Sequence, residues 1–399
     1  MKSNNKQLFR LVVAITAGIA FGAISPDWGI RATNSFRELF GAFMRFFVPF
    51  IVLGLVSASI ASFRRGAGQT LFTTLAFAAI STISACFLAF FITQAAAPFL
   101  LGGNTALPPA NPATVITPFF TMDIPPMFDV KTALLTAILF GLGISAASAN
   151  RLRDIAVEFK DIILEILRKA VVPTLPIYVF TVVANLTADG QLVALGGGCS
   201  RIMVVAAALS ICMLVLQYTV AGVVTGRSPA KSILTMLPAY LAGCGSCSSV
   251  ATVPLTIRQT RENGVAGDTA ELVVPLCSSI HHVGGVCNMI VFTSGLMILS
   301  GGIPSFAAFA KFIMLLSVVS FASPGVPGGL ALACASIAES ALGFTPDRYA
   351  VVVALYLAMD SLGTACNLSC DGALAMIVDG IRRRGPFAVR KPVLAPIPA

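Results

Sequence analysis

The chain has 399 residues, of which 57% are apolar and only 11% are charged, and its mean hydropathy is +0.90. A soluble globular domain carries about a quarter of its residues as charged side chains, so this composition excludes that class. The net charge of +9 does not indicate a nucleic-acid-binding protein, because Lys and Arg lie in short connections between apolar runs.

Apolar runs recur along the chain at about twenty residues or more, the length that a helix needs to cross a bilayer. The first run follows a basic segment but has no convincing small-residue cleavage site, so it predicts a membrane helix rather than a signal peptide. The first part of the chain thus contains six predicted spans, at 8–26, 40–62, 70–100, 132–149, 158–187 and 191–225.

Lys and Arg gather in alternate connections between these spans. They precede the first span, follow the second, fourth and sixth spans, and recur at 382–391 near the end of the chain. Because basic connections stay in the cytoplasm, both termini are predicted to be cytoplasmic, with 386–399 as a tail. The pattern predicts a multi-pass protein of the cell membrane.

Two later apolar stretches are interrupted by small and helix-breaking residues. The segment 243–249 (GCGSCSS) interrupts the stretch 230–262, and the segment 323–329 (SPGVPGG) interrupts the stretch 303–345. Each is followed by a long apolar stretch, at 264–299 and 348–381. Such residues are tolerated at membrane depth only where backbone lines a cavity or is buried in protein. Two re-entrant hairpins in related repeats would place a transporter's binding site there, whereas two kinked helices are the alternative.

The last apolar stretch carries four polar residues on one helical face. Asp360, Thr364, Asn367 and Asp371 are spaced by four, three and four residues. A carboxylate inside a membrane costs several kcal/mol unless it meets a cation, a partner or water, so these acids indicate a functional site. The alternative is a polar stripe that joins helices by hydrogen bonds.

The only two histidines, His281 and His282, lie midway along the stretch 264–299 and precede Val283, Gly284 and Gly285. The paired glycines are expected to unwind the helix there. Unwound carbonyl groups suit hard cations such as Na⁺, and an imidazole can take up a proton near neutral pH. The alternative is a hydrogen-bonded core histidine.

Several cysteines lie in these same segments, and thiols together with imidazoles would suit a soft metal. Cys244 and Cys247 have the C-x-x-C spacing, which is a weak motif on its own. Small residues that allow close helix packing are the favoured interpretation of this set: Cys244, Cys247, Cys277, Cys366 and Cys370.

Three motifs resemble the dicarboxylate/amino acid:cation symporter family, whose members share the glutamate-transporter-like fold. Ser248 and Ser249 lead to a T-x-P-x-T element at 252–256, and G-V-P-G occurs at 325–328. The segment 360–371 follows the family pattern D-x-x-R-T-x-x-N-x-x-x-D except at Gly363. The resemblance covers nearly the whole chain and is strongest from about Pro229 onward.

The resemblance implies an all-α polytopic membrane protein with eight spanning helices and two re-entrant helical hairpins in inverted repeats. It also implies a homotrimer of elevator-type transporters. Segments 1–69 and 101–190 would form a scaffold. Segments 70–100 and 191–385 would form a mobile transport domain, with the second hairpin as its gate.

By position, the resemblance assigns a substrate site and cation sites. Asp360 would hold a substrate amino group, and Asp371 and Asn367 with the carbonyls of Cys277 and His281 would form one sodium site. The implied substrate-binding residues are Ser248, Ser249, Val250, Gly325, Val326, Gly328, Asp360, Gly363, Thr364 and Asn367. The implied cation-binding residues are Ser81, Thr82, Cys277, Ser279, His281, His282, Ser320, Ser323, Asn367 and Asp371.

Two departures from the family pattern bear on substrate and coupling ion. Gly363 replaces the Arg that pairs with an acidic side chain, which disfavours glutamate and aspartate and favours serine, alanine or threonine. Val283 replaces an Asp expected to bind sodium with the hydroxyls of Ser81 and Thr82. Fewer coupled sodium ions are therefore expected, with proton coupling through His281.

These observations predict a secondary symporter for a small neutral amino acid, coupled to Na⁺, H⁺ or both, with no other cofactor. The first alternative is a symporter for acidic amino acids or dicarboxylates on the same fold. The second is a soft-metal protein that uses His281, His282 and nearby cysteines. An enzyme is not expected, because the two histidines and the nearby cysteines are the only candidates in the sequence for a nucleophile–base pair.

Overall fold

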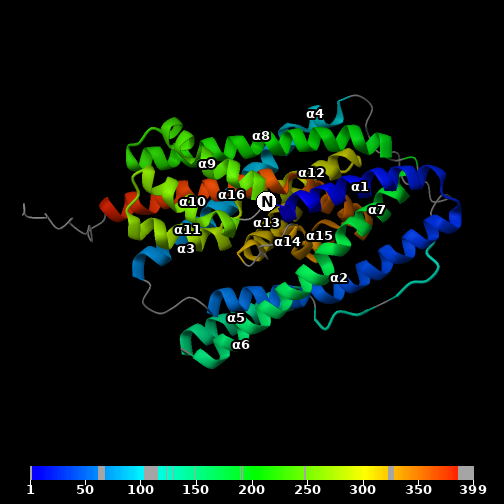
Figure 1. The fold of residues 1–399 in the computed structure, drawn as a ribbon, viewed down its shortest axis with the longest axis horizontal. Helices are drawn as coiled ribbons and strands as arrows, with labels where there is room; N and C mark the ends of the chain where they lie inside the picture. The colour runs from blue at the N-terminus through cyan, green and yellow to red at the C-terminus, as the bar shows by residue number, and fades with distance from the viewer. Residues whose placement is uncertain are drawn as a thin grey trace, which may run out of the picture.

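The computed structural model describes residues 2–61, 68–102, 116–122, 124–128, 130–147, 149–188, 190, 192–246, 249–321 and 328–384. Within these residues the chain is a bundle of helices without strands, which confirms the predicted all-α class (Figure 1). In chain order the elements are α1 (Lys2–Ile24), α2 (Asp27–Ala61), α3 (Gly68–Ala95), α4 (Ala97–Leu101), α5 (Val130–Ala147), α6 (Asn150–Ile166), the π-helix η2 (Leu167–Val171), α7 (Val172–Ala188), α8 (Leu192–Thr225), α9 (Pro229–Ser246), α10 (Ser249–Glu262), α11 (Gly267–Ile280), α12 (Val283–Leu299), α13 (Phe306–Ser320), α14 (Gly329–Ala333), α15 (Ala335–Leu342) and α16 (Pro346–Arg384).

Five segments of the described chain are long and apolar enough to cross a bilayer. They lie in α2, in α3, in α8, in α11 and α12 together, and in α16. A sixth is the bent pair formed by α6 with η2 and α7. The remaining two predicted spans correspond to shorter apolar segments, Val13–Ile24 in α1 and Leu135–Ala147 in α5. The chain is a multi-pass membrane protein.

The predicted span 158–187 is not one straight helix. It comprises the end of α6, the π-helical turn η2 and most of α7, and the two α-helices meet at an angle of 49°. Pro176 lies inside α7 and has no backbone N–H to donate, and its ring conflicts with the carbonyl four residues earlier. A π-helical turn followed by proline is a recognised cause of such a bend.

Small residues allow two close helix pairs in the first half of the chain. Helix α1 packs along α7, where a Cβ atom on Gly22 would lie 2.2 Å from the carbonyl oxygen of Ala184. Helix α2 packs along α5, where a Cβ atom on Gly141 would lie 2.7 Å from the Cβ of Ile60. Without a hydrophobic drive between helices in lipid, such van der Waals contacts are a main source of association.

Helix α16 is the centre of the second half of the chain, and α8, α9, α10, α11 and α12 pack around it (Figure 1). Every residue of α16 from Gly363 to Gly380 is buried. The part of the predicted polar face that contains Thr364, Asn367 and Asp371 therefore meets protein rather than lipid, as a functional intramembrane acid requires.

The arms of both predicted hairpins are present and pack against each other. Helix α9 packs against α10, and α13 packs against α15, which α14 precedes. The first pair also packs on α16, where a Cβ atom on Gly243 would lie 3.1 Å from the Cα of Ala365. The hairpins thus border the polar part of α16.

Candidate binding and coupling site

The long segment that contains the histidines is broken, but not where the glycines lie. Helix α11 ends at Ile280 and α12 begins at Val283, so only His281 and His282 are outside the helices. Gly284 and Gly285 form the first turn of α12, and the expectation that they unwind the helix is wrong. Their N–H groups, which lack intrahelical acceptors, both donate to Oδ1 of Asn367, at 2.7 and 3.2 Å.

Gly284 is required instead by the close approach of α12 to α16. A Cβ atom at position 284 would lie 2.5 Å from the carbonyl oxygen of Gly363 and 2.8 Å from the Cβ of Cys366. The first of these neighbours is backbone and cannot rotate away. The two glycines therefore let the start of α12 touch the middle of α16.

We expect Gly284→Ala to lower the melting temperature of the purified protein measurably. Overpacking of a tight interior costs about 1–3 kcal/mol, and here the clash is with backbone. The matched control is Gly143→Ala in α5, where an added Cβ meets nothing within 4 Å. Alanine is the better helix former, so this control should be neutral or stabilising. Equal melting temperatures for the two variants would contradict the close approach.

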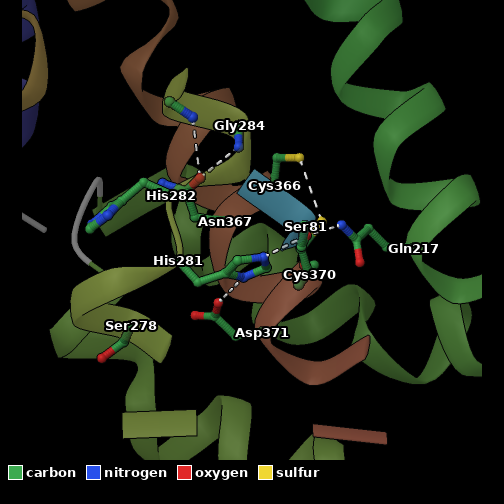
Figure 2. Close-up of polar contacts among 12 residues, drawn as sticks. Ser81, Gln217, Ser278, His281, His282, Gly284, Cys366, Asn367, Cys370 and Asp371 are labelled. Carbon is green, nitrogen blue, oxygen red and sulfur yellow. Dashed lines mark hydrogen bonds and ion pairs between the residues drawn. The ribbon is translucent and has the colours of Figure 1, made fainter. Parts of the chain in front are cut away.

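The imidazole of His281 joins three helices at the break. His281 is fully buried, and its Nδ1 lies 2.9 Å from Oδ1 of Asp371 on α16. Its Nε2 lies 2.9 Å from Oγ of Ser81 on α3, which in turn accepts a hydrogen bond from Nε2 of Gln217 on α8 (Figure 2). The four side chains form one continuous relay across the bundle.

The donors and acceptors of this relay agree in direction. The amide of Gln217 donates to Ser81. With a neutral imidazole that carries its proton on Nδ1, the Ser81 hydroxyl donates to Nε2 of His281, and Nδ1–H donates to the carboxylate of Asp371. A second proton on the imidazole would reverse the Ser81 contact and place a cation beside the carboxylate. The relay is thus complete with a neutral imidazole and can accept one proton by turning a hydroxyl.

Two buried oxygens on helices that contribute to the relay have no hydrogen-bond partner in the described structure: Oδ2 of Asp371 on α16 and Oγ1 of Thr82 on α3. Both belong to the implied cation-binding set. A buried polar atom without a partner is costly, so an unpaired carboxylate oxygen is a ready ligand for a cation. One of the two carboxylate oxygens of Asp371 is used by His281, and only the other remains.

His282 makes a separate contact with the second hairpin. Its Nδ1 donates to the carbonyl oxygen of Ser320, at the end of α13, at 2.9 Å. This carbonyl belongs to an implied cation-binding residue, and an imidazole N–H is bound to it. Ser279, also in that set, is exposed on α11, and Cys277 uses its carbonyl to accept the N–H of His281 at 2.8 Å.

The second hairpin meets the acidic face of α16 at Asp360. The N–H of Gly328 donates to Oδ2 of this half-buried carboxylate at 3.3 Å. Gly328 precedes α14 and has φ of +72°, a left-handed conformation that glycine adopts without strain. Thr364 lies one turn further along α16 and is buried. The structure thus brings a hairpin and the polar face together.

Some implied site residues lie outside the described part of the chain: Ser248, Ser323, Gly325 and Val326. Val250 lies in α10, but its side chain is not among those described. Ser249 begins α10, is half-buried, and its carbonyl accepts a hydrogen bond from the hydroxyl of Thr252 at 2.8 Å. The position of the first hairpin is therefore known from its two helical arms, α9 and α10.

Cys247 lies outside the described residues, and the described cysteines of these segments do not assemble a metal site. No three His, Cys, Asp or Glu side chains converge for a metal ion among the residues that the structure describes. Cys366 and Cys370 lie one helical turn apart, with their sulfurs at 3.9 Å, and Cys366 also faces the carbonyl of Ser210. Close packing accounts for the described members of the set, and the soft-metal alternative gains no support from them.

Two polar residues near this site were not singled out from the sequence. Gln217 ends the relay, and Asn288 is buried in α12 next to Gly363. Both are uncharged amides inside long apolar stretches, a signal that the search for carboxylates and histidines passed over.

The geometry joins a polar face on α16, a broken helix beside it and a hairpin that contacts the Asp360 carboxylate. Comparison with known protein families gives a match to a family of transporters. The description of the matching family is "Sodium:dicarboxylate symporter family", and the match extends over residues 8–381, nearly the whole chain. The protein belongs to the sodium:dicarboxylate symporter family.

Proposed function

We propose that this member of the family carries a small neutral amino acid, and that the His281–Asp371 pair stands in for one of its sodium sites. Transport by a secondary symporter follows from the family. The solute and the coupling ion are the parts proposed here. The observation that carries the substrate class is Gly363, and the one that carries the coupling is the imidazole of His281.

Gly363 leaves the substrate face of α16 without a positive charge. No Lys or Arg lies on α16 between Arg348 and Arg382. A carboxylate side chain of a substrate would need a bidentate guanidinium to offset its desolvation. Asp360, by contrast, is placed to hold the ammonium group that every amino acid carries. A solute with one positive group and an uncharged side chain fits these charges best.

The test is uptake by proteoliposomes that contain the purified protein. We expect serine, threonine or alanine to inhibit the uptake of labelled serine at least tenfold more effectively than aspartate, glutamate or succinate does. The missing charge-assisted pair is worth about 1.5–3 kcal/mol, which is ten- to more than a hundredfold in affinity. Stronger uptake of aspartate or succinate than of serine would support the dicarboxylate alternative and refute this proposal.

The coupling proposal rests on the position of the imidazole. His281 occupies Oδ1 of Asp371 and the hydroxyl of Ser81, two groups implied for sodium binding. At position 283 a buried valine replaces a carboxylate, which removes a further anionic ligand. A proton on His281 would supply the positive charge that a sodium ion supplies elsewhere in the family. We therefore expect fewer sodium ions per solute and a contribution from protons.

We also propose a homotrimer in which 1–69 and 101–190 form a static scaffold and 70–100 with 191–385 form the moving transport domain. Two observations support this division. Helix α1 packs on α7 and α2 packs on α5, whereas α8, α9, α10, α11 and α12 pack on α16. Native mass spectrometry of the detergent-solubilised protein distinguishes a trimer from a monomer, and a monomer would contradict the proposal.

A further inference from the structure

Asn288 is a buried amide with neither of its polar atoms satisfied. It lies in α12, its exposed fraction is 1%, and neither Nδ2 nor Oδ1 has a hydrogen-bond partner in the described structure. Buried side-chain amides in folded proteins are almost always paired, because each unpaired donor or acceptor keeps its full desolvation cost. A molecule from outside the chain that both donates and accepts hydrogen bonds would satisfy both atoms.

The amide faces the position at which the family pattern is broken. A Cβ atom on Gly363 would lie 3.0 Å from Nδ2 of Asn288. Asn288 is one turn along α12 from Gly284, which touches the carbonyl of Gly363. The Asn288 amide therefore stands where a side chain at position 363 would begin, in place of the missing arginine.

Asn288 is also within reach of a solute held at Asp360. The rise of an α-helix is about 1.5 Å per residue, so Gly363 is only about 4.5 Å further along α16 than Asp360. Both belong to one face of that helix. An amino acid whose ammonium group meets Asp360 can point a short side chain at the Asn288 amide.

We propose that Asn288 recognises the side-chain hydroxyl of the transported amino acid and so selects serine or threonine over alanine. The inference rests on the proposed transport of neutral amino acids. A carboxamide offers both an acceptor and donors, and a hydroxyl group both donates and accepts, so the two groups satisfy each other. The amide carries no charge to offset a carboxylate, and its closeness to α16 favours a short side chain.

The experiment compares serine and alanine in wild-type protein and in Asn288→Leu. Leucine has the same number and branching of side-chain heavy atoms as asparagine but no polar atoms, so the variant removes recognition and keeps the shape of the side chain. Half-inhibitory concentrations of serine and alanine are measured against labelled threonine uptake in proteoliposomes for the wild type. For the variant, direct uptake of labelled alanine and labelled serine is measured at several concentrations.

We expect the wild type to prefer serine to alanine by about tenfold, the value of one or two neutral hydrogen bonds. In Asn288→Leu this ratio should fall to about one through a selective loss of serine uptake, and the melting temperature should be kept, because an unsatisfied amide has left the core. A preference for serine that survives in Asn288→Leu, including the case in which serine and alanine uptake fall by the same factor, would overturn the inference.

The wild-type measurement separates this inference from the function on which it rests. Equal affinity for serine and alanine in the wild type would overturn recognition by Asn288 and leave neutral amino acid transport standing. Uptake of neither amino acid would overturn both. The wild-type arm can therefore overturn the inference even if the variant does not fold.

Discussion

Substitution of Asp360 by asparagine is expected to abolish uptake of the amino acid. The carboxylate meets the second hairpin through Gly328 at 3.3 Å and is the group that we propose binds the ammonium group of the substrate. Removal of one partner from a desolvated charge pair costs about 2–5 kcal/mol, which is roughly thirtyfold to several thousandfold in affinity. Initial rates of labelled serine uptake, taken over a wide range of serine concentrations, measure the loss.

The control is Glu339→Gln, which neutralises a carboxylate of the same hairpin. Glu339 is exposed on α15, so its removal should change uptake by less than twofold. Asparagine at position 360 can still accept the N–H of Gly328, so the fold and the melting temperature should be kept. Normal serine uptake by Asp360→Asn would show that the ammonium group binds elsewhere and would refute the proposed substrate orientation.

The helix pattern of α16 was predictable because a single helix obeys a fixed geometry. Residues three and four positions apart share a face whatever surrounds them, so Asp360, Thr364, Asn367 and Asp371 could be grouped from spacing alone. The hairpin arms were predictable for a similar reason, since small and helix-breaking residues inside an apolar stretch exclude a plain spanning helix. These are local rules, and they were sufficient for the fold class.

The relay through His281 could not be derived from local rules. Ser81 is 200 positions away from His281 and Asp371 is 90 positions away, so only tertiary packing brings them together. The resemblance assigned Asp371 and Ser81 to cation sites, but it did not show that an imidazole would fill the space between them. Spacing in the sequence carries no information on which of two nearby groups a third side chain will contact.

The unwound residues and the bend were missed for a different physical reason. Glycine is permissive rather than obligatory for a helix break, so Gly284 and Gly285 could as well be the residues that allow close packing of α12 on α16. The bend between α6 and α7 depends on a π-helical turn, which has no clear sequence pattern. At Gly284 the backbone is decided by the close approach of α16, and between α6 and α7 by the π-helical turn and Pro176.

Replacement of His281 by asparagine is expected to exchange a proton dependence for a sodium dependence. Asparagine cannot hold an added proton, so the acceleration of serine uptake by an inward proton gradient should disappear. The change also leaves Asp371 buried without its partner, which costs about 3–5 kcal/mol. The melting temperature should therefore fall steeply in sodium-free buffer, and it is measured in choline, potassium and sodium salts.

Sodium should restore part of this loss, because an ion that binds only the folded protein stabilises it by about 2.7 kcal/mol at a concentration of one hundred times its dissociation constant. Addition of Val283→Asp to His281→Asn supplies a second carboxylate and should strengthen the restoration further. Other titratable groups near Asp371, among them Cys277, Cys370 and Tyr218, are unchanged in both variants.

If wild-type uptake ignores a pH gradient and needs several sodium ions per serine, the imidazole is only a structural partner of Asp371. A variant with the same stability in choline and in sodium would likewise show that no ion site lies beneath the histidine. The two measurements together decide whether this protein couples its solute to a proton held on a side chain or to a metal ion held by oxygens.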